Sequence, residues 1–161
     1  MTKKMTFHVP QDRDLLAAIG EVALRHEHLN HILRMTIKTL ARLDVNEALD
    51  ATGYDSSSQL RDRIKKLARQ RLGEGEALLK LQALLERCKR ATEKRNDLVH
   101  SVWGEELDGK PVRKGSGSEW RPLPTTTELH NLAKDLGNLT SQLNEARLVG
   151  FLHVALNHRV K

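Results

Sequence analysis

Cysteine and aromatic residues are scarce in this chain. Cys88 is the one cysteine among 161 residues, and aromatic residues make up 3%. A single cysteine excludes a disulfide within the chain and argues against a cysteine-based zinc site. Its apolar helical position predicts buried packing instead. With so few aromatic residues, a core must be built from Leu, Ile, Val and Ala, which favours helices over a β-sandwich.

Long apolar runs are also missing. Nothing approaches the ~20 consecutive apolar residues that a membrane-spanning helix needs. The first residues, "MTKKMTFHVPQD", contain two lysines but no apolar segment of the kind found in signal peptides. We therefore expect a cytoplasmic protein that has no membrane partner.

Charge is plentiful and unbalanced. Charged residues make up 30% of the chain, and the formal net charge is +6. Such an excess favours acidic partners, with nucleic acid the first candidate, although many basic proteins bind nothing anionic. The length suits a single domain over residues 1–161.

Apolar residues recur at steps of three and four, which predicts an all-α fold. The expected long helices cover residues 11–43, 76–102 and 125–160, and the shorter ones cover 45–51 and 58–72. Asp12 or Asp14 is expected at the start of the first helix, and one of the serines 56–58 is expected to cap the third. Thr125 and Glu128 have capping-box spacing. Gly20 predicts a close contact between helices, because glycine is otherwise costly inside a helix.

The segment 104–124 breaks this helical pattern and holds four of the ten glycines and three of the four prolines. Asp108-Gly109 is a turn signal between two short extended pieces, so we expect a small β-hairpin or loop insertion before the last helix. Helices of about 30 residues are about 45 Å long, more than a globule of this size needs. The sequence therefore predicts an elongated up-down bundle whose surplus length forms a dimer seam.

The most specific pattern is "TEKRNDLVHSVWG", residues 92–104. Asn96 and His100 are one helical turn apart and share a face. Arg95 and His100 differ by five positions, which is about 140° around a helix axis. Three arrangements would bring them together: unwinding of the helix near His100, a swing of the long arginine side chain, or pairing with a second chain.

These residue types suit cleavage within RNA, where the 2′-hydroxyl is the nucleophile. His100 titrates near neutrality and can serve as base or acid. Arg95 is permanently charged and can stabilise the phosphorane, while Asn96 can orient His100 or hold a phosphate oxygen. This chemistry requires no metal and no other cofactor.

The run from Arg95 to His100 resembles the R-x4-6-H motif of the HEPN superfamily (higher eukaryotes and prokaryotes nucleotide-binding). A polar residue commonly follows the arginine in that motif, and Asn96 fits; "SVWG" after His100 is also similar to many bacterial members. The resemblance implies a helical bundle that pairs as a homodimer with its two motifs facing each other. It also implies metal-independent endoribonuclease activity with Arg95, His100 and Asn96 in the site. Many members act as toxins or in defence, so an antitoxin or regulatory partner is a further expectation, while other members have lost catalysis.

Residues near the motif are candidates for holding RNA. Lys89, Arg90 and Lys94 are suited to a phosphate backbone, and Trp103 can stack on a base or anchor the insertion. The basic stretch 61–71 is either a second RNA contact or an ordinary solvated face.

Simpler interpretations stay open. His100 can interact with the negative end of a helix dipole, and Arg95 can pair with Asp97 or Glu93. The chain could then be a non-catalytic module that binds RNA, a nucleotide or a protein, or a plain dimeric scaffold. The run "RHEHLNH" suggests a metal site, but His26 and His28 point to different helix faces, and Glu27 with His31 gives too few ligands.

Overall fold

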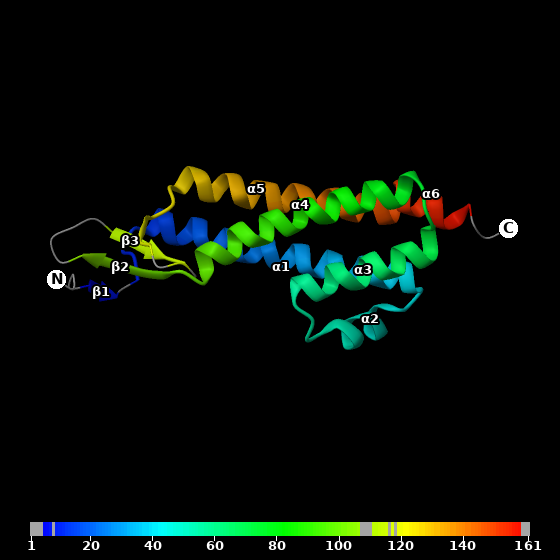
Figure 1. Ribbon diagram of the computed structural model, residues 1–161, viewed down its shortest axis with the longest axis horizontal. Coiled ribbons are helices and arrows are strands. Elements are labelled where there is room, and N and C mark those ends of the chain that lie inside the picture. Colours follow the sequence, from blue (N-terminus) through cyan, green and yellow to red (C-terminus); the bar gives the residue numbers. More distant parts are fainter. Residues whose placement is uncertain (1–4, 8, 107–110, 116, 118, 159–161) are drawn as a thin grey trace.

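The computed structural model describes residues 5–7, 9–106, 111–115, 117 and 119–158. They form an elongated helical bundle with a small antiparallel sheet at one end (Figure 1). The helices are α1 (Arg13–Ala41), α2 (Val45–Thr52), α3 (Ser57–Leu72), α4 (Glu76–Val99), α5 (Thr126–Leu148) and α6 (Phe151–Asn157). The strands are β1 (Met5–Phe7), β2 (Val102–Glu106), β3 (Pro111–Lys114) and β4 (Arg121–Pro122). The predicted all-α bundle with a small β insertion is confirmed.

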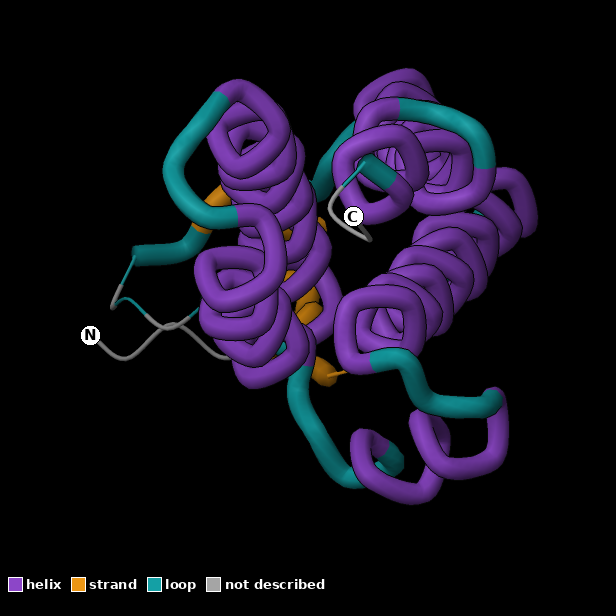
Figure 2. Tube along the Cα trace, turned by 90° about the vertical axis from the view of Figure 1, so that its right-hand side faces the viewer, coloured by secondary structure: helices purple, strands orange, loops and turns teal. Residues whose placement is uncertain are grey.

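The long helices run up and down the length of the bundle. α1 leaves the sheet end, α4 returns to it, and α5 leaves it again (Figure 1). α1 packs most extensively against α5 and then against α3. Figure 2 shows the helices from the end opposite the sheet, with the strands behind them. The end of α4 therefore lies beside the start of α1 and beside the sheet.

Local signals in the sequence set the helix starts. Asp12 caps α1 by accepting hydrogen bonds from the backbone N–H groups of Asp14 and Leu15. Ser56 caps α3, and Thr125 and Glu128 form the predicted capping box of α5. The first turn of α3, to which Ser57 belongs, is consequently fixed in position.

Two expectations about the helices are wrong. Gly20 is exposed, and a Cβ built on it meets nothing within 4 Å, so close packing within the chain does not explain this glycine. The expected last helix is two helices, because Val149 leaves helical geometry at φ −140° and ψ −15°. Gly150 then passes so close to α5 that an added Cβ would lie 2.9 Å from the Cα of Ala146.

The sheet has the order β1-β2-β3-β4 with every neighbouring pair antiparallel. The predicted hairpin is β2 with β3, in which Trp103 faces Arg113. It begins at Val102, so α4 ends three residues earlier than expected. The sequence did not predict β1 or β4, and the proposed turn at 108–109 lies outside the described residues.

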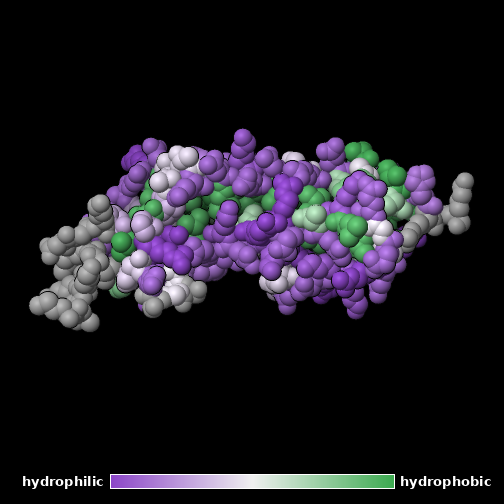
Figure 3. All heavy atoms as spheres, turned by 45° about the horizontal axis from the view of Figure 1, so that its top comes forward, coloured by the Kyte–Doolittle hydropathy of each residue, from purple (hydrophilic) through white to green (hydrophobic). Residues whose placement is uncertain are grey.

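Aliphatic side chains fill two buried clusters along the bundle. The cluster at the sheet end includes Leu15, Val22, Leu29, Cys88, Leu129 and Leu136. The cluster at the other end includes Leu33, Leu40, Leu60, Ile64, Leu81 and Leu143. Hydrophilic side chains surround the hydrophobic ones that reach the surface along the bundle (Figure 3). Among the described residues, no helix combines the length and apolar character needed to cross a membrane.

Candidate functional site

The motif lies at the end of α4, beside the sheet. Arg95 is half-buried, and its Nη1 donates a hydrogen bond to Oδ1 of Asn96 over 3.0 Å. Asn96 is exposed. His100 is the exposed C-cap residue, and its backbone N–H donates to the Asn96 carbonyl over 3.0 Å. The structure thus joins the arginine and the amide directly and leaves the imidazole open to solvent.

Arg95 and His100 do not meet within one chain. α4 ends at Val99, and His100 leaves helical geometry as the C-cap, but this early end does not bring its side chain to Arg95. Nε of Arg95 is buried, and the positive charge of Arg95 helps to lower the pKa of the buried His26 on α1. Within the part of the chain described, no hydrogen bond joins the His100 imidazole to Arg95 or Asn96. Neither arrangement within one chain brings the two side chains together, and pairing with a second chain stays a prediction.

The sheet holds the motif in place. Nη1 of Arg113 on β3 lies 2.7 Å from Oδ2 of Asp97, and it also reaches Oγ of Ser101 over 3.3 Å. Ser101 donates to the Asp97 carbonyl, and Gly115 passes so close to Asp97 that an added Cβ would lie 2.9 Å from its Oδ1. Asp97 therefore pairs with the sheet and not with Arg95.

Trp103 makes a second contact between the sheet and the end of α4. Its indole Nε1–H donates to the Leu98 carbonyl over 3.2 Å, and its half-buried ring packs against the core cluster at the sheet end. These contacts support its interpretation as an anchor for the insertion. Because Leu98 precedes His100 by two residues, the same contact holds the residues around the imidazole.

A buried polar cluster lies behind Arg95. We name it the polar junction and define it as His26 and Asn30 of α1, Ser57 and Arg61 of α3, and Thr92 and Arg95 of α4. Nε2 of His26 lies 3.2 Å from Oγ1 of Thr92 and 3.4 Å from Oγ of Ser57. Ser57 donates to Oδ1 of Asn30 over 2.5 Å. The junction therefore connects three helices and shares Arg95 with the motif.

Charge in the polar junction is positive. Burial lowers the pKa of His26 to about 4, with a further lowering from Arg95 and Arg61 that Glu27 partly opposes. His26 is consequently neutral at pH 7, while the two guanidinium groups stay charged. The junction holds its imidazole as a hydrogen-bonding group and not as a proton carrier.

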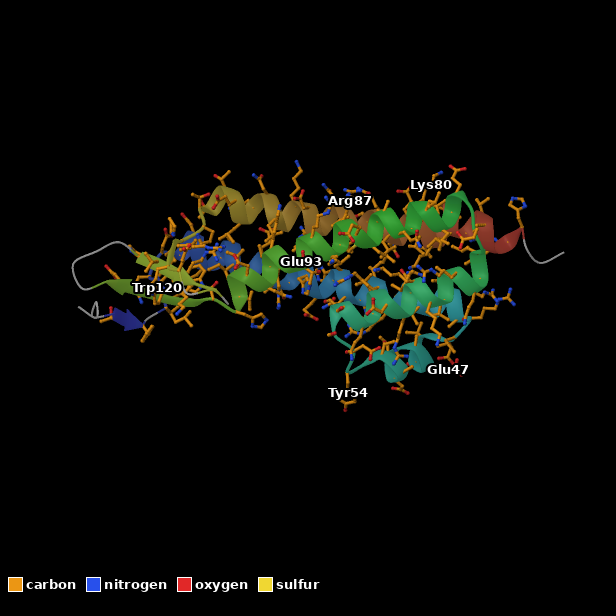
Figure 4. The ribbon with its side chains drawn as sticks, viewed as in Figure 1. Glu47, Tyr54, Lys80, Arg87, Glu93 and Trp120 are labelled. Atoms are coloured by element: carbon orange, nitrogen blue, oxygen red, sulfur yellow. The ribbon has the colours of Figure 1, made fainter. Side chains whose placement is uncertain are left out.

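The residues expected to hold RNA lie along the exposed side of α4. Lys89, Arg90 and Lys94 are all exposed, and Nζ of Lys89 lies 4.0 Å from Oε1 of Glu93, a residue labelled in Figure 4. Lys94 lines a cavity of about 380 Å³ together with Asp97 and other residues of α4, β3 and α5. The structure therefore gathers these cations along the same part of α4 as the motif.

Sequence reasoning missed the polar junction. It treated Arg61 as part of a charged stretch, but this side chain is 7% exposed. It also left His26 with the exposed His28 and His31 as a weak metal candidate. The spacing of His26 and Asn30, one turn apart, was an available signal. In the part of the chain described, no three His, Cys, Asp or Glu side chains are grouped as metal ligands.

Comparisons of the chain with models of known protein families, with curated proteins and with solved structures found no match.

Proposed function

We propose that this protein is a metal-independent endoribonuclease that cuts single-stranded RNA as a homodimer. One observation carries the proposal: an exposed His100 lies at the end of a helix in which Arg95 and Asn96 are hydrogen-bonded to each other one turn earlier. The resemblance to HEPN ribonucleases and the net charge of +6 support the same substrate.

The reaction uses groups that the RNA and these residues supply. A base removes the proton of a 2′-hydroxyl, whose oxygen attacks the neighbouring phosphorus. The bond from phosphorus to the 5′-oxygen then breaks, and an acid protonates that oxygen. His100 serves as base or acid, and Arg95 stabilises the charge on the phosphorane. The products are a 2′,3′-cyclic phosphate and a free 5′-hydroxyl.

A second copy completes the site in this proposal. Arg95 lies within α4 and His100 is the C-cap after it, with no hydrogen bond between their side chains, so a dimer would combine the arginine of one chain with the imidazole of the other. Val99 and Val102, which flank His100, are 40% and 50% exposed. Exposed aliphatic side chains at this position support an interface at the motif.

Cleavage assays test the proposal directly. Purified protein is expected to cut single-stranded RNA in EDTA and to leave 2′,3′-cyclic phosphate ends. His100→Ala should abolish cleavage without changing the circular dichroism spectrum. His153→Ala is the matched control, because it removes an exposed histidine from α6 at the other end of the bundle. Cleavage that survives His100→Ala would remove the imidazole from the mechanism.

The partial burial of Arg95 favours a second candidate, a non-catalytic module that binds RNA, a nucleotide or a protein. This module would show binding that persists in His100→Ala and weakens steeply with salt. If the protein is a ribonuclease, the resemblance points to a toxin or defence role in the cytoplasm, with an antitoxin or regulatory partner.

A further inference from the structure

The polar junction contains buried nitrogen atoms that have no hydrogen-bond partner. Arg61 is 7% exposed and His26 is 3% exposed. Nη1 of Arg61, Nδ1 of His26 and Nε of Arg95 are buried and unpartnered within the described residues. Glu27 brings a carboxylate oxygen to 4.0 Å from Nδ1 of His26, but its side chain is 63% exposed. The positive groups of the junction are thus left without a buried anion.

Buried guanidinium groups destabilise the folded chain unless a counterion or a hydrogen-bond acceptor binds to them. A buried charge without a counterion costs several kcal/mol, and proteins normally pair such groups or replace them with apolar ones. Arg61 follows Leu60 and precedes Ile64 on the inner side of α3, where an aliphatic residue would pack without that cost. The retained guanidinium therefore points to a ligand.

The start of α3 takes part in the junction, because Oγ of Ser57 contacts Nε2 of His26 and donates to Oδ1 of Asn30. Side chains on a helix lean towards its N-terminus, so Arg61 leans over the turn that begins at Ser57. The N-terminus of a helix carries a partial positive charge and free backbone N–H groups, which favour anions. Ser57 and Arg95 are half-buried, whereas Arg61 and His26 are buried. The two guanidinium groups are positively charged donors, while the acceptor atoms are the oxygen of Asn30, the hydroxyl lone pairs and one nitrogen of the neutral His26 imidazole.

We propose that the polar junction binds a phosphate group, held by Arg61 and Arg95 together with the first turn of α3. If the protein is the ribonuclease proposed above, on which this step rests, the group is a backbone phosphate next to the one that is cut. Arg95 would then contact RNA from both the motif and the junction. The same chemistry would also accept free phosphate, and these two sources are separable by experiment.

Thermal unfolding measures the binding without any cleavage. The probes are inorganic phosphate and a single-stranded RNA that carries 2′-O-methyl groups and cannot be cut. Either ligand should raise the unfolding midpoint of the wild-type chain as its concentration increases. Arg61→Met should equal or exceed the wild-type midpoint without ligand, because a buried unpaired charge is gone. In Arg61→Met, phosphate should no longer raise the unfolding midpoint.

Lys66→Met is the matched control, because it removes an exposed positive charge from the same helix. In this control, phosphate should still raise the unfolding midpoint. A lower midpoint for Arg61→Met together with an unchanged response to both ligands would assign Arg61 a structural role and overturn the proposal. A response to RNA alone supports a backbone phosphate, and a response to inorganic phosphate as well supports a site open to the free ion.

These results separate the two proposals. A phosphate response that depends on Arg61, in a protein that cuts no RNA, would keep the polar junction and reject the ribonuclease. Cleavage that depends on His100, with a phosphate response that Arg61→Met leaves intact, would keep the ribonuclease and reject the junction.

Discussion

Arg113 of β3 and Asp97 of α4 form an ion pair, with 2.7 Å between Nη1 and Oδ2, that ties the sheet to the helix end carrying the motif. The two side chains are 13% and 39% exposed, so the pair is partly shielded from solvent. The same Nη1 reaches Ser101, the residue after His100. The insertion therefore stabilises the position of the residues around the candidate site.

Arg113→Ala is expected to lower the free energy of unfolding by about 1–2 kcal/mol, the range for a charged hydrogen bond that is partly exposed. Urea denaturation measures this loss. Arg121→Ala is the control, since it removes an exposed arginine from β4 of the same sheet. Equal losses in the two variants would mean that the pair with Asp97 contributes nothing particular.

A mixture of two inactive variants tests whether the site forms between chains. Arg95→Ala and His100→Ala should each be inactive alone. If an arginine of one chain works with the histidine of the other, mixed dimers contain one intact pair, and about a quarter of the wild-type activity should return. The measurement is RNA cleavage after the variants are denatured together and refolded. No recovery, with mixed dimers confirmed by native mass spectrometry, would contradict pairing between chains.

Much of the fold was predictable because its signals are local. The periodicity of leucine placed the long helices, and the capping residues Asp12, Ser56 and Thr125 placed their starts. The break at Gly150 was not predictable in this way, because the apolar pattern continues through it into α6. β1 was also missed, since a three-residue strand depends on its pairing with β2, which is distant in sequence.

The candidate site likewise has a part that local sequence signals predict and a part that depends on contacts between distant segments. Arg95, Asn96 and His100 form a short motif that can be found in the sequence, and helix geometry already placed Arg95 and His100 on different faces. The polar junction depends on three helices that meet only in the folded chain. A basic stretch does not reveal which of its members points inward, so the burial of Arg61 had to come from the structure.

The buried His26 makes stability depend on pH. Its pKa is about 4 in the folded chain and about 6.5 in an unfolded one. Between these values the unfolded chain binds a proton that the folded chain does not, so stability falls as the pH falls from 6.5 to 4. The full difference is about 3 kcal/mol. Urea denaturation across this range measures it.

His26→Gln is the informative comparison, because glutamine keeps a hydrogen-bonding group near Thr92 and Ser57 but does not titrate. The groups that face His26 are these two hydroxyls, Arg61, Arg95 and the carboxylate of Glu27. The variant should lose most of the decline between pH 6.5 and 4. A decline as steep as that of the wild-type chain would show that other groups cause it.

Lys94 is expected to contact the RNA backbone, because it is exposed one residue before Arg95. Each phosphate contact on a single strand contributes about 0.7 to the slope of log affinity against log salt. Lys94→Ala should therefore weaken RNA binding at low salt and reduce that slope by about 0.7. Fluorescence anisotropy with an uncleavable 2′-O-methyl RNA measures both quantities. Lys134→Ala, an exposed lysine on α5, is the control and should leave the slope unchanged. If both variants change the slope equally, the protein attracts RNA through its overall charge, and the strand does not lie along the end of α4.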